Sequence, residues 1–116
     1  MSNLAVRVMP ETIRSVNFTA ITGTSYVGIG SAFDHPPHSY KWNNNTNVDL
    51  MLSWNGIDDH EFMPARSGFV NDIASNKNFP AGSFSISQGT RFYVREISAA
   101  PTSGDVYVTV FYGFNG

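Results

Sequence analysis

Residues 48–56 read Val48-Asp49-Leu50-Met51-Leu52-Ser53-Trp54-Asn55-Gly56. Every second side chain up to Trp54 is apolar, which is the pattern of a β-strand with one buried face. Asn-Gly favours a two-residue type I′ hairpin turn, because both residues accept positive φ. We expect a return strand over about residues 59–63. The stretch therefore predicts an antiparallel hairpin.

Turn signals recur downstream of this hairpin at short intervals. They lie at residues 64–68, 75–78, 80–82, 87–89 and 101–104. The runs between them predict strands at residues 69–73, 83–87, 90–97 and 105–114. In the last run both faces carry apolar side chains, which indicates a central strand or one whose outer face meets a partner. Many short strands between close turns are typical of a sandwich or barrel.

Upstream of the hairpin the pattern is weaker. Residues 16–20 and 26–33 are the candidate strands there, although Gly28 and Gly30 weaken the second one. Residues 34–39 are expected to form a surface loop or an edge, because two prolines remove two backbone donors. Residues 43–47 predict a second loop.

These patterns predict an all-β fold, an antiparallel β-sandwich of jelly-roll type with about eight strands. The chain is expected to form a single domain over residues 1–116, with residues 1–15 as a candidate extended N-terminal arm. The expected core consists of Val16, Phe18, Leu50, Leu52, Trp54, Phe62, Phe84, Phe92, Val94, Val108 and Val110.

The composition narrows the function classes. Charged residues make up 14% of the 116 positions, against about 25% in an average soluble domain, so the surface is suited to packing against neighbouring subunits. The basic residues form no stripe that could neutralise nucleic-acid phosphates. No apolar run reaches the length of a membrane span, and no signal-peptide core is visible near the start. The absence of cysteine is compatible with assembly in a reducing cytoplasm.

Two polar clusters are candidates for chemistry. In Asp58-Asp59-His60-Glu61, strand alternation would place Asp59 and Glu61 on one side and the other two residues on the opposite side. A hydrolase centred on Asp59, Glu61 and His60 is therefore a remote hypothesis. His35 and His38 flank two prolines that forbid the helix a zinc clamp would use. We predict no catalytic residue, no metal ligand and no cofactor.

Aromatic side chains offer another kind of site. Trp54 ends an apolar face and is expected in the core, whereas Tyr40 and Trp42 flank loops and are candidates for sugar stacking or subunit contact.

The stretch from Val48 to Tyr112 resembles a family of small structural proteins of tailed bacteriophages. The shared pattern consists of Ser53-Trp54-Asn55-Gly56, Asp59-His60, Phe62, Pro64-Ala65, Asp72, Ser75-Asn76-Lys77, Pro80-Ala81-Gly82, Gly89-Thr90, Tyr93-Val94 and Ser103-Gly104-x-Val106-Tyr107. Phage relatives commonly read S-F-D-G-x-x-D-H at the first motif, so Trp54 and Asn55 are conservative departures. The resemblance covers a little over half of the chain.

This resemblance implies an all-β virion component without enzymatic activity or cofactor. We expect a capsid decoration or cement protein, or a neck or tail connector, assembled in the bacterial host cytoplasm. Its partners would be other phage structural subunits and further copies of itself, with no nucleic acid and no membrane. The candidate interface residues are Tyr26, Tyr40, Trp42, Tyr107 and Phe111. The alternative is a carbohydrate-binding module that recognises host glycans through Tyr40, Trp42 and the loop from His35 to His38.

Overall fold

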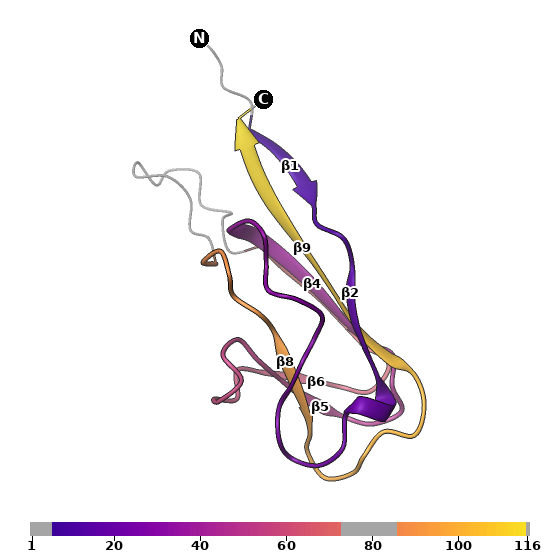
Figure 1. Ribbon diagram of the computed structural model, residues 1–116. Coiled ribbons are helices and arrows are strands. Elements are labelled where there is room, and N and C mark those ends of the chain that lie inside the picture. Colours follow the sequence, from indigo (N-terminus) through magenta and orange to yellow (C-terminus); the bar gives the residue numbers. More distant parts are fainter. Residues whose placement is uncertain (1–5, 73–85, 116) are drawn as a thin grey trace.

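The computed structural model describes residues 6–72 and 86–115, which form two antiparallel sheets packed as a sandwich (Figure 1). The larger sheet has the order β1-β9-β4-β7, and β2 also pairs with β9. The smaller sheet has the order β3-β8-β5-β6. The strands of the larger sheet are β1 (Val6–Pro10), β2 (Arg14–Asn17), β4 (Pro37–Asn44), β7 (Ser67–Asp72) and β9 (Asp105–Asn115). Those of the smaller sheet are β3 (Val27–Gly28), β5 (Leu50–Ser53), β6 (Glu61–Met63) and β8 (Tyr93–Glu96).

The strand order is that of a jelly roll, so the predicted fold class is confirmed. Strands β2-β9-β4-β7 and β3-β8-β5-β6 form the two four-stranded layers that an eight-stranded double Greek key produces. Strand β1 is additional to these eight strands. It pairs with the C-terminal half of β9, whereas β2 pairs with the N-terminal half of β9. Part of the segment expected to be an extended arm is therefore built into the larger sheet (Figure 1). No helix in the described part of the chain is long and apolar enough to cross a membrane.

The predicted hairpin forms, but its turn differs from the expectation. Strands β5 and β6 pair in the register Leu50 with Met63 and Leu52 with Glu61. A type I′ turn needs positive φ at Asn55, and Arg66 is the one non-glycine residue with positive φ in the described segments. The Asn55 side chain instead accepts the backbone N–H groups of Ile57 and Asp58 at 2.9 and 3.0 Å. An Asx turn therefore shapes a longer loop over residues 54–60.

Both loops predicted upstream of the hairpin, at residues 34–39 and 43–47, overlap strand β4, so their predicted bounds were wrong. Strand β4 runs from Pro37 to Asn44 between β7 and β9, so it is central rather than an edge. Pro37 is tolerated because it opens the strand and the register shifts between Pro37 and Ser39. At the other end the buried Asn44 amide donates to the carbonyls of Val48, Met63 and Pro64. Residues 43 and 44 thus belong to the strand, and the loop begins after them.

The first two candidate strands are also shorter than expected. Strand β2 ends at Asn17, whose side chain caps a short 3₁₀ helix over Phe18–Ala20. Strand β3 is limited to Val27–Gly28. The chain leaves it at Gly30, which has φ of 63° and packs on Arg14 so closely that a β-carbon would lie 2.7 Å from the Arg14 β-carbon. Most of the strand predicted at residues 83–87 lies outside the described residues.

Six predicted core residues are buried: Leu50, Leu52, Phe92, Val94, Val108 and Val110. Val16 and Trp54 are partly buried against that core, and Phe18 is half-exposed. The prediction for Phe62 is wrong, because it is 52% exposed on the outside of β6, whereas the neighbouring Met63 is buried. Phe84 lies outside the described residues. The core also contains residues that the patterns did not identify: Ile21, Ile29, Phe33, Tyr40, Trp42, Met63, Ile86 and Val106.

Candidate functional site

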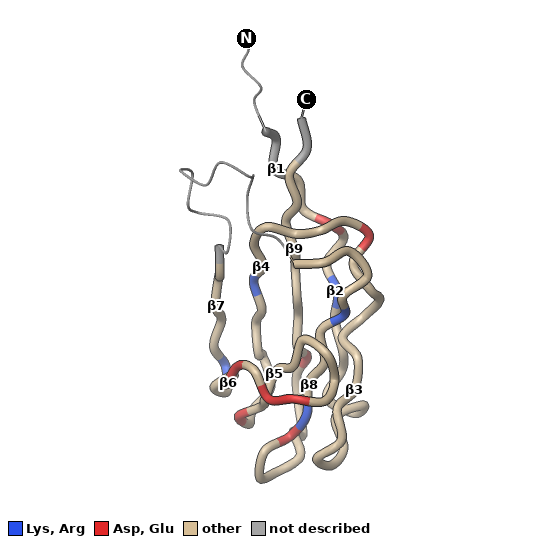
Figure 2. Tube along the Cα trace, turned by 90° about the vertical axis from the view of Figure 1, so that its left-hand side faces the viewer, with Lys and Arg blue, Asp and Glu red and all other residues tan. Residues whose placement is uncertain are grey.

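The larger sheet has a side turned away from the smaller sheet, and it is poor in charge. Tyr40, Trp42, Val108 and Val110 are buried toward the smaller sheet, so the residues between them on β4 and β9 point outward. We call this side the outer face and define it, among the described side chains, by Pro10, Ile13, Ser15, Asn17, Ser39, Lys41, Asn43, Gly68, Val70, Asp105, Tyr107, Thr109 and Phe111. Lys41 and Asp105 are the charged residues in that set, and Figure 2 shows few charged positions along β4, β7 and β9.

The centre of the outer face is hollowed. An open hollow of about 220 Å³ is lined by Ile13, Lys41, Asn43, Tyr107 and Thr109. Ile13 is 57% exposed, and it contributes an apolar wall. The Lys41 ammonium, the Asn43 amide and the Thr109 hydroxyl supply polar groups. The Tyr107 hydroxyl already donates to Asp105 at 3.1 Å, a bond that raises the pKa of Tyr107 above its usual value.

The outer face continues to an open strand edge. β7 pairs with β4 on one side, and no other described strand pairs with its opposite side. Exposed edges are normally protected by charged residues, proline or a bulge. Strand β7 contains no proline and one charged residue, Asp72 at its end, and Phe69 and Val70 are 46% and 64% exposed. Within residues 6–72 and 86–115 this edge is unpaired, so it is available for pairing with another chain.

Two of the predicted interface residues lie together on the outer face. Tyr107 and Phe111 are on β9, and both are half-buried. Tyr26 precedes β3 of the smaller sheet, where its hydroxyl donates to Asp59. Arg95 binds the same carboxylate through Nε at 3.2 Å and Nη2 at 2.9 Å. Tyr26 therefore belongs to a contact within the smaller sheet rather than to the outer face.

Electrostatics of this contact follow from its geometry. Hydrogen bonds from Arg95 and Tyr26 hold the pKa of Asp59 below its usual value. Burial, followed by the hydrogen bond to Asp59, raises the pKa of Tyr26 to about 12. Asp59 is consequently an ionised structural partner, engaged on both oxygens.

Tyr40 and Trp42 are core residues, so their prediction as interface or sugar-stacking residues is wrong. They are 0% and 4% exposed. The expectation failed because the predicted loops beside these rings lie partly in the central strand β4, which runs from Pro37 to Asn44. Their polar atoms point to Glu61: the Tyr40 hydroxyl donates to it, and the Trp42 indole N–H donates at 3.0 Å. Burial and then this hydrogen bond raise the pKa of Tyr40 above its usual value.

Strand alternation was not the right description of the Asp58–Glu61 cluster, because only Glu61 lies in a strand. Glu61 faces the aromatic core, Asp59 binds Arg95, and the His60 Nδ1 accepts the backbone N–H of Trp54 at 2.9 Å. The described residues contain no group of three or more His, Cys, Asp or Glu side chains that could hold a metal ion.

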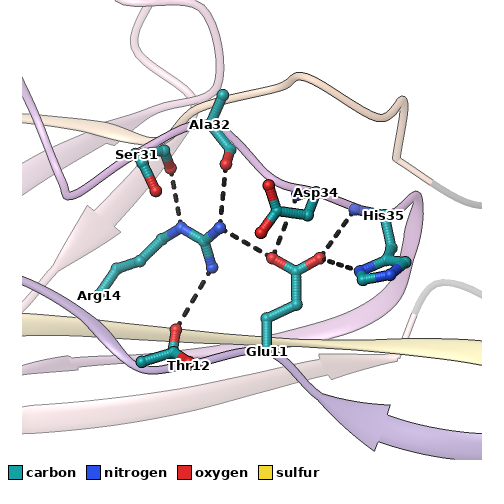
Figure 3. Close-up of polar contacts among 7 residues, drawn as sticks. All are labelled: Glu11, Thr12, Arg14, Ser31, Ala32, Asp34 and His35. Carbon is teal, nitrogen blue, oxygen red and sulfur yellow. Dashed lines mark hydrogen bonds and ion pairs between the residues drawn. The ribbon is translucent and has the colours of Figure 1, made fainter.

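A buried ion cluster was missed by the sequence patterns (Figure 3). The Glu11 and Arg14 side chains are 4% and 7% exposed and form a 2.8 Å ion pair. Arg14 also donates to the carbonyls of Ser31 and Ala32 at 2.8 and 3.0 Å. Glu11 also accepts the backbone N–H and Nδ1 of His35, each at 2.8 Å.

The cluster fastens the loop before β4 to the segment between β1 and β2. It also explains His35, whose ring stacks on Tyr112 at a centroid distance of 3.7 Å. His38 lies within β4. The sequence offered little indication of this cluster. The partners of Glu11 and Arg14 in the loop before β4 are more than 15 residues away in the sequence.

No family model matches the chain, and no curated protein matches it.

Proposed function

We propose that this chain is a non-enzymatic structural protein of a bacteriophage virion, which decorates or cements a capsid or connects subunits at the neck or tail. The observation that carries the proposal is the continuous docking surface formed by the outer face and the open edge of β7. The described side chains of this surface combine exposed apolar groups with two charged residues, Lys41 and Asp105, and the Asp105 carboxylate is already bound by Tyr107 and Asn17. Such a surface is suited to burial between subunits, because the cores of interfaces are depleted in charge.

The fold supports the proposal without being specific to it. Jelly rolls serve as viral capsid domains, and also as lectin and cupin domains. The pattern shared with small phage structural proteins favours the first of these uses. The lectin use would need accessible aromatic rings, but Tyr40 and Trp42 are buried. The polar clusters are occupied by contacts within the fold, since Glu11, Asp59 and Glu61 each bind at least two side chains.

The protein content of purified phage particles tests the proposal directly. Phage particles would be isolated from an induced or infected culture by density-gradient centrifugation and analysed by mass spectrometry. We expect the chain to sediment with the particles at a fixed ratio to the other structural subunits. If the chain were absent from particles and bound specific glycans on an array through accessible rings, the virion proposal would be wrong and the carbohydrate-binding alternative would replace it.

A further inference from the structure

The loop between β5 and β6 presents an apolar side chain next to a carboxylate. Ile57 is 79% exposed, more than any other large hydrophobic residue in the described segments. Asp58 follows it and is exposed as well. We call these two residues the tip. An isoleucine this exposed has no role in the core of its own chain.

The tip is held in a fixed conformation. The Ser53 hydroxyl accepts the backbone N–H groups of Asn55 and Gly56 at 3.2 and 2.9 Å. The Asn55 side chain accepts from the backbone of Ile57 and Asp58 and donates to the Asp58 carboxylate at 3.0 Å. A loop ordered in advance loses little conformational entropy when it binds. The fold therefore maintains an exposed isoleucine in a rigid loop, which is typical of a binding element.

The hollow on the outer face has complementary chemistry. Ile13 is an exposed apolar wall, and Lys41 is a cation beside it. Lys41 forms no ion pair within the described residues, and the Asp105 carboxylate on the same face is bound by Tyr107 and Asn17. Covering the hollow with a purely apolar partner would therefore bury the Lys41 ammonium without a counter-ion from the described part of the chain, which is costly. The partner must therefore supply an apolar group and a carboxylate side by side, and the tip has this pair.

We propose that the tip of one copy of this chain binds in the outer-face hollow of a second copy, with Ile57 against Ile13 and the Asp58 carboxylate against the Lys41 ammonium. The inference rests on the proposed role as an assembling virion subunit and names one of its partners. The tip belongs to the smaller sheet, whereas the hollow lies on the side of the larger sheet turned away from it. The contact is therefore head-to-tail, and repeating it produces a ring or a filament rather than a two-fold dimer.

Sedimentation velocity of the purified full chain tests the proposal over a concentration series. We expect reversible association beyond the dimer for the wild type. Lys41→Glu and Asp58→Lys should each weaken association at least tenfold, because each places like charges in the contact. Ile57→Ser should weaken it to a similar extent by removing the apolar anchor. Two matched controls, Arg66→Glu and Phe62→Ser, change an exposed charge and an exposed hydrophobic residue elsewhere and should leave association unchanged.

An equimolar mixture of the two charge variants is the decisive sample. In the mixture, the Asp58 tip of the Lys41→Glu protein meets an unaltered Lys41, and the altered tip of the other protein meets the altered hollow. Association should therefore return in the mixture, although each variant alone associates at least tenfold more weakly than the wild type. A wild type that stays monomeric at every concentration, single variants that associate normally, or a mixture without recovery would each overturn the proposal. Recovery of the chain on purified particles would still support the virion role in those cases, so the two proposals fail separately.

Discussion

The indole N–H of Trp42 on β4 donates to the carboxylate of Glu61 on β6 at 3.0 Å, so this bond joins the two sheets of the sandwich. The same carboxylate accepts the Tyr40 hydroxyl and, at 3.2 Å, the indole N–H of Trp54. Three aromatic donors therefore share one acceptor group between the sheets. The Tyr40 hydroxyl in turn accepts from the Asn71 amide at 3.0 Å, which extends the network to β7.

Replacing Glu61 by alanine should destabilise the fold strongly. The variant leaves the buried Trp42 donor without its partner, and an unsatisfied buried donor costs about 1–3 kcal/mol. We expect the free energy of unfolding to fall by about 2–4 kcal/mol, measured by urea denaturation with tryptophan fluorescence. Asp34→Ala, which removes an exposed carboxylate, is the control and should change it by about 0.5 kcal/mol or less. Equal losses for the two variants would contradict this role of Glu61.

Local patterns predicted the parts of the fold that depend on local signals. The alternation over residues 48–54 and 105–114 produced β5 and β9, and the jelly-roll class followed from the number and spacing of turns. Strand β4 could not be predicted in the same way. Its Pro37 looked like a strand breaker, and its Asn44 looked like a loop residue. Both are accommodated by distant partners: a bulge against β9, and the carbonyls of Met63 and Pro64.

The same reason explains where the structure places the predicted interface residues, whose role at an interface stays a prediction. Tyr107 and Phe111 were identified on a strand whose two faces were legible from the sequence. Tyr40 and Trp42 were misplaced because their strand was not recognised. The hollow forms because strand pairing brings Ile13 close to Lys41 and Thr109. These residues are far apart in the sequence, so no short-range pattern predicts that they share a site.

The Glu11 cluster should make stability sensitive to acid. Burial alone would raise the pKa of Glu11, but hydrogen bonds from His35, Asp34 and Arg14 outweigh it and lower the pKa below 4.5. A carboxyl with a lowered folded-state pKa stabilises the fold above its unfolded pKa, and this contribution is lost as pH falls through the folded value. We expect the urea midpoint of the wild type to drop below about pH 4.5.

Glu11→Gln tests the origin of that drop. The variant should be less stable at neutral pH by about 3 kcal/mol, because it leaves the buried Arg14 without its counter-ion. The stability of the variant should change less with acidification than that of the wild type. The urea midpoints of the two proteins, plotted against pH, should therefore approach each other at low pH. Parallel curves over the whole range would assign the acid sensitivity to other carboxylates.

Alanine substitutions at Gly89 and Gly104 distinguish the free-energy cost of backbone strain from the cost of steric overlap. Gly104 has φ of 91°, and a β-carbon there would overlap the carbonyl oxygen of Asn45. Gly89 has φ of 89°, and a β-carbon there would meet nothing within 4 Å. Gly89→Ala should therefore cost about 1 kcal/mol, from the left-handed conformation alone. Gly104→Ala should cost about 3 kcal/mol or more, because the overlap adds to the strain. Urea denaturation of both variants measures the difference, and equal costs would show that the turn at Gly104 relaxes.

Alkaline titration should report the Tyr26–Asp59 contact. The pKa of Tyr26 is about 12 in the folded chain, above its usual value of 10.0. A group with a raised folded-state pKa stabilises the fold below its unfolded pKa, and the contribution is lost as pH rises through the folded value. Stability should therefore decline between about pH 10 and 12. Tyr26→Phe should lessen the decline and remove one late-titrating phenol from the ultraviolet absorbance titration. An unchanged titration would place the Tyr26 phenol in solvent.

Attachment to the particle should depend on the aromatic residues of the outer face more than on the surface ion pair. Tyr107 and Phe111 are half-buried in the free chain and would be covered further by a partner. Truncating a buried aromatic anchor typically costs about 2 kcal/mol or more of binding energy. Asp59 lies outside the outer face and binds Arg95 and Tyr26 of its own chain. Purified particles that carry the Tyr107→Ala or Phe111→Ala chain should therefore lose it more readily on dilution than particles that carry the Asp59→Ala chain.

Salt of a few hundred millimolar should leave the wild-type chain attached to the particle, because screening weakens exposed charge pairs much more than buried contacts. Release by such salt alone would indicate an attachment held by charge and would contradict docking through the outer face.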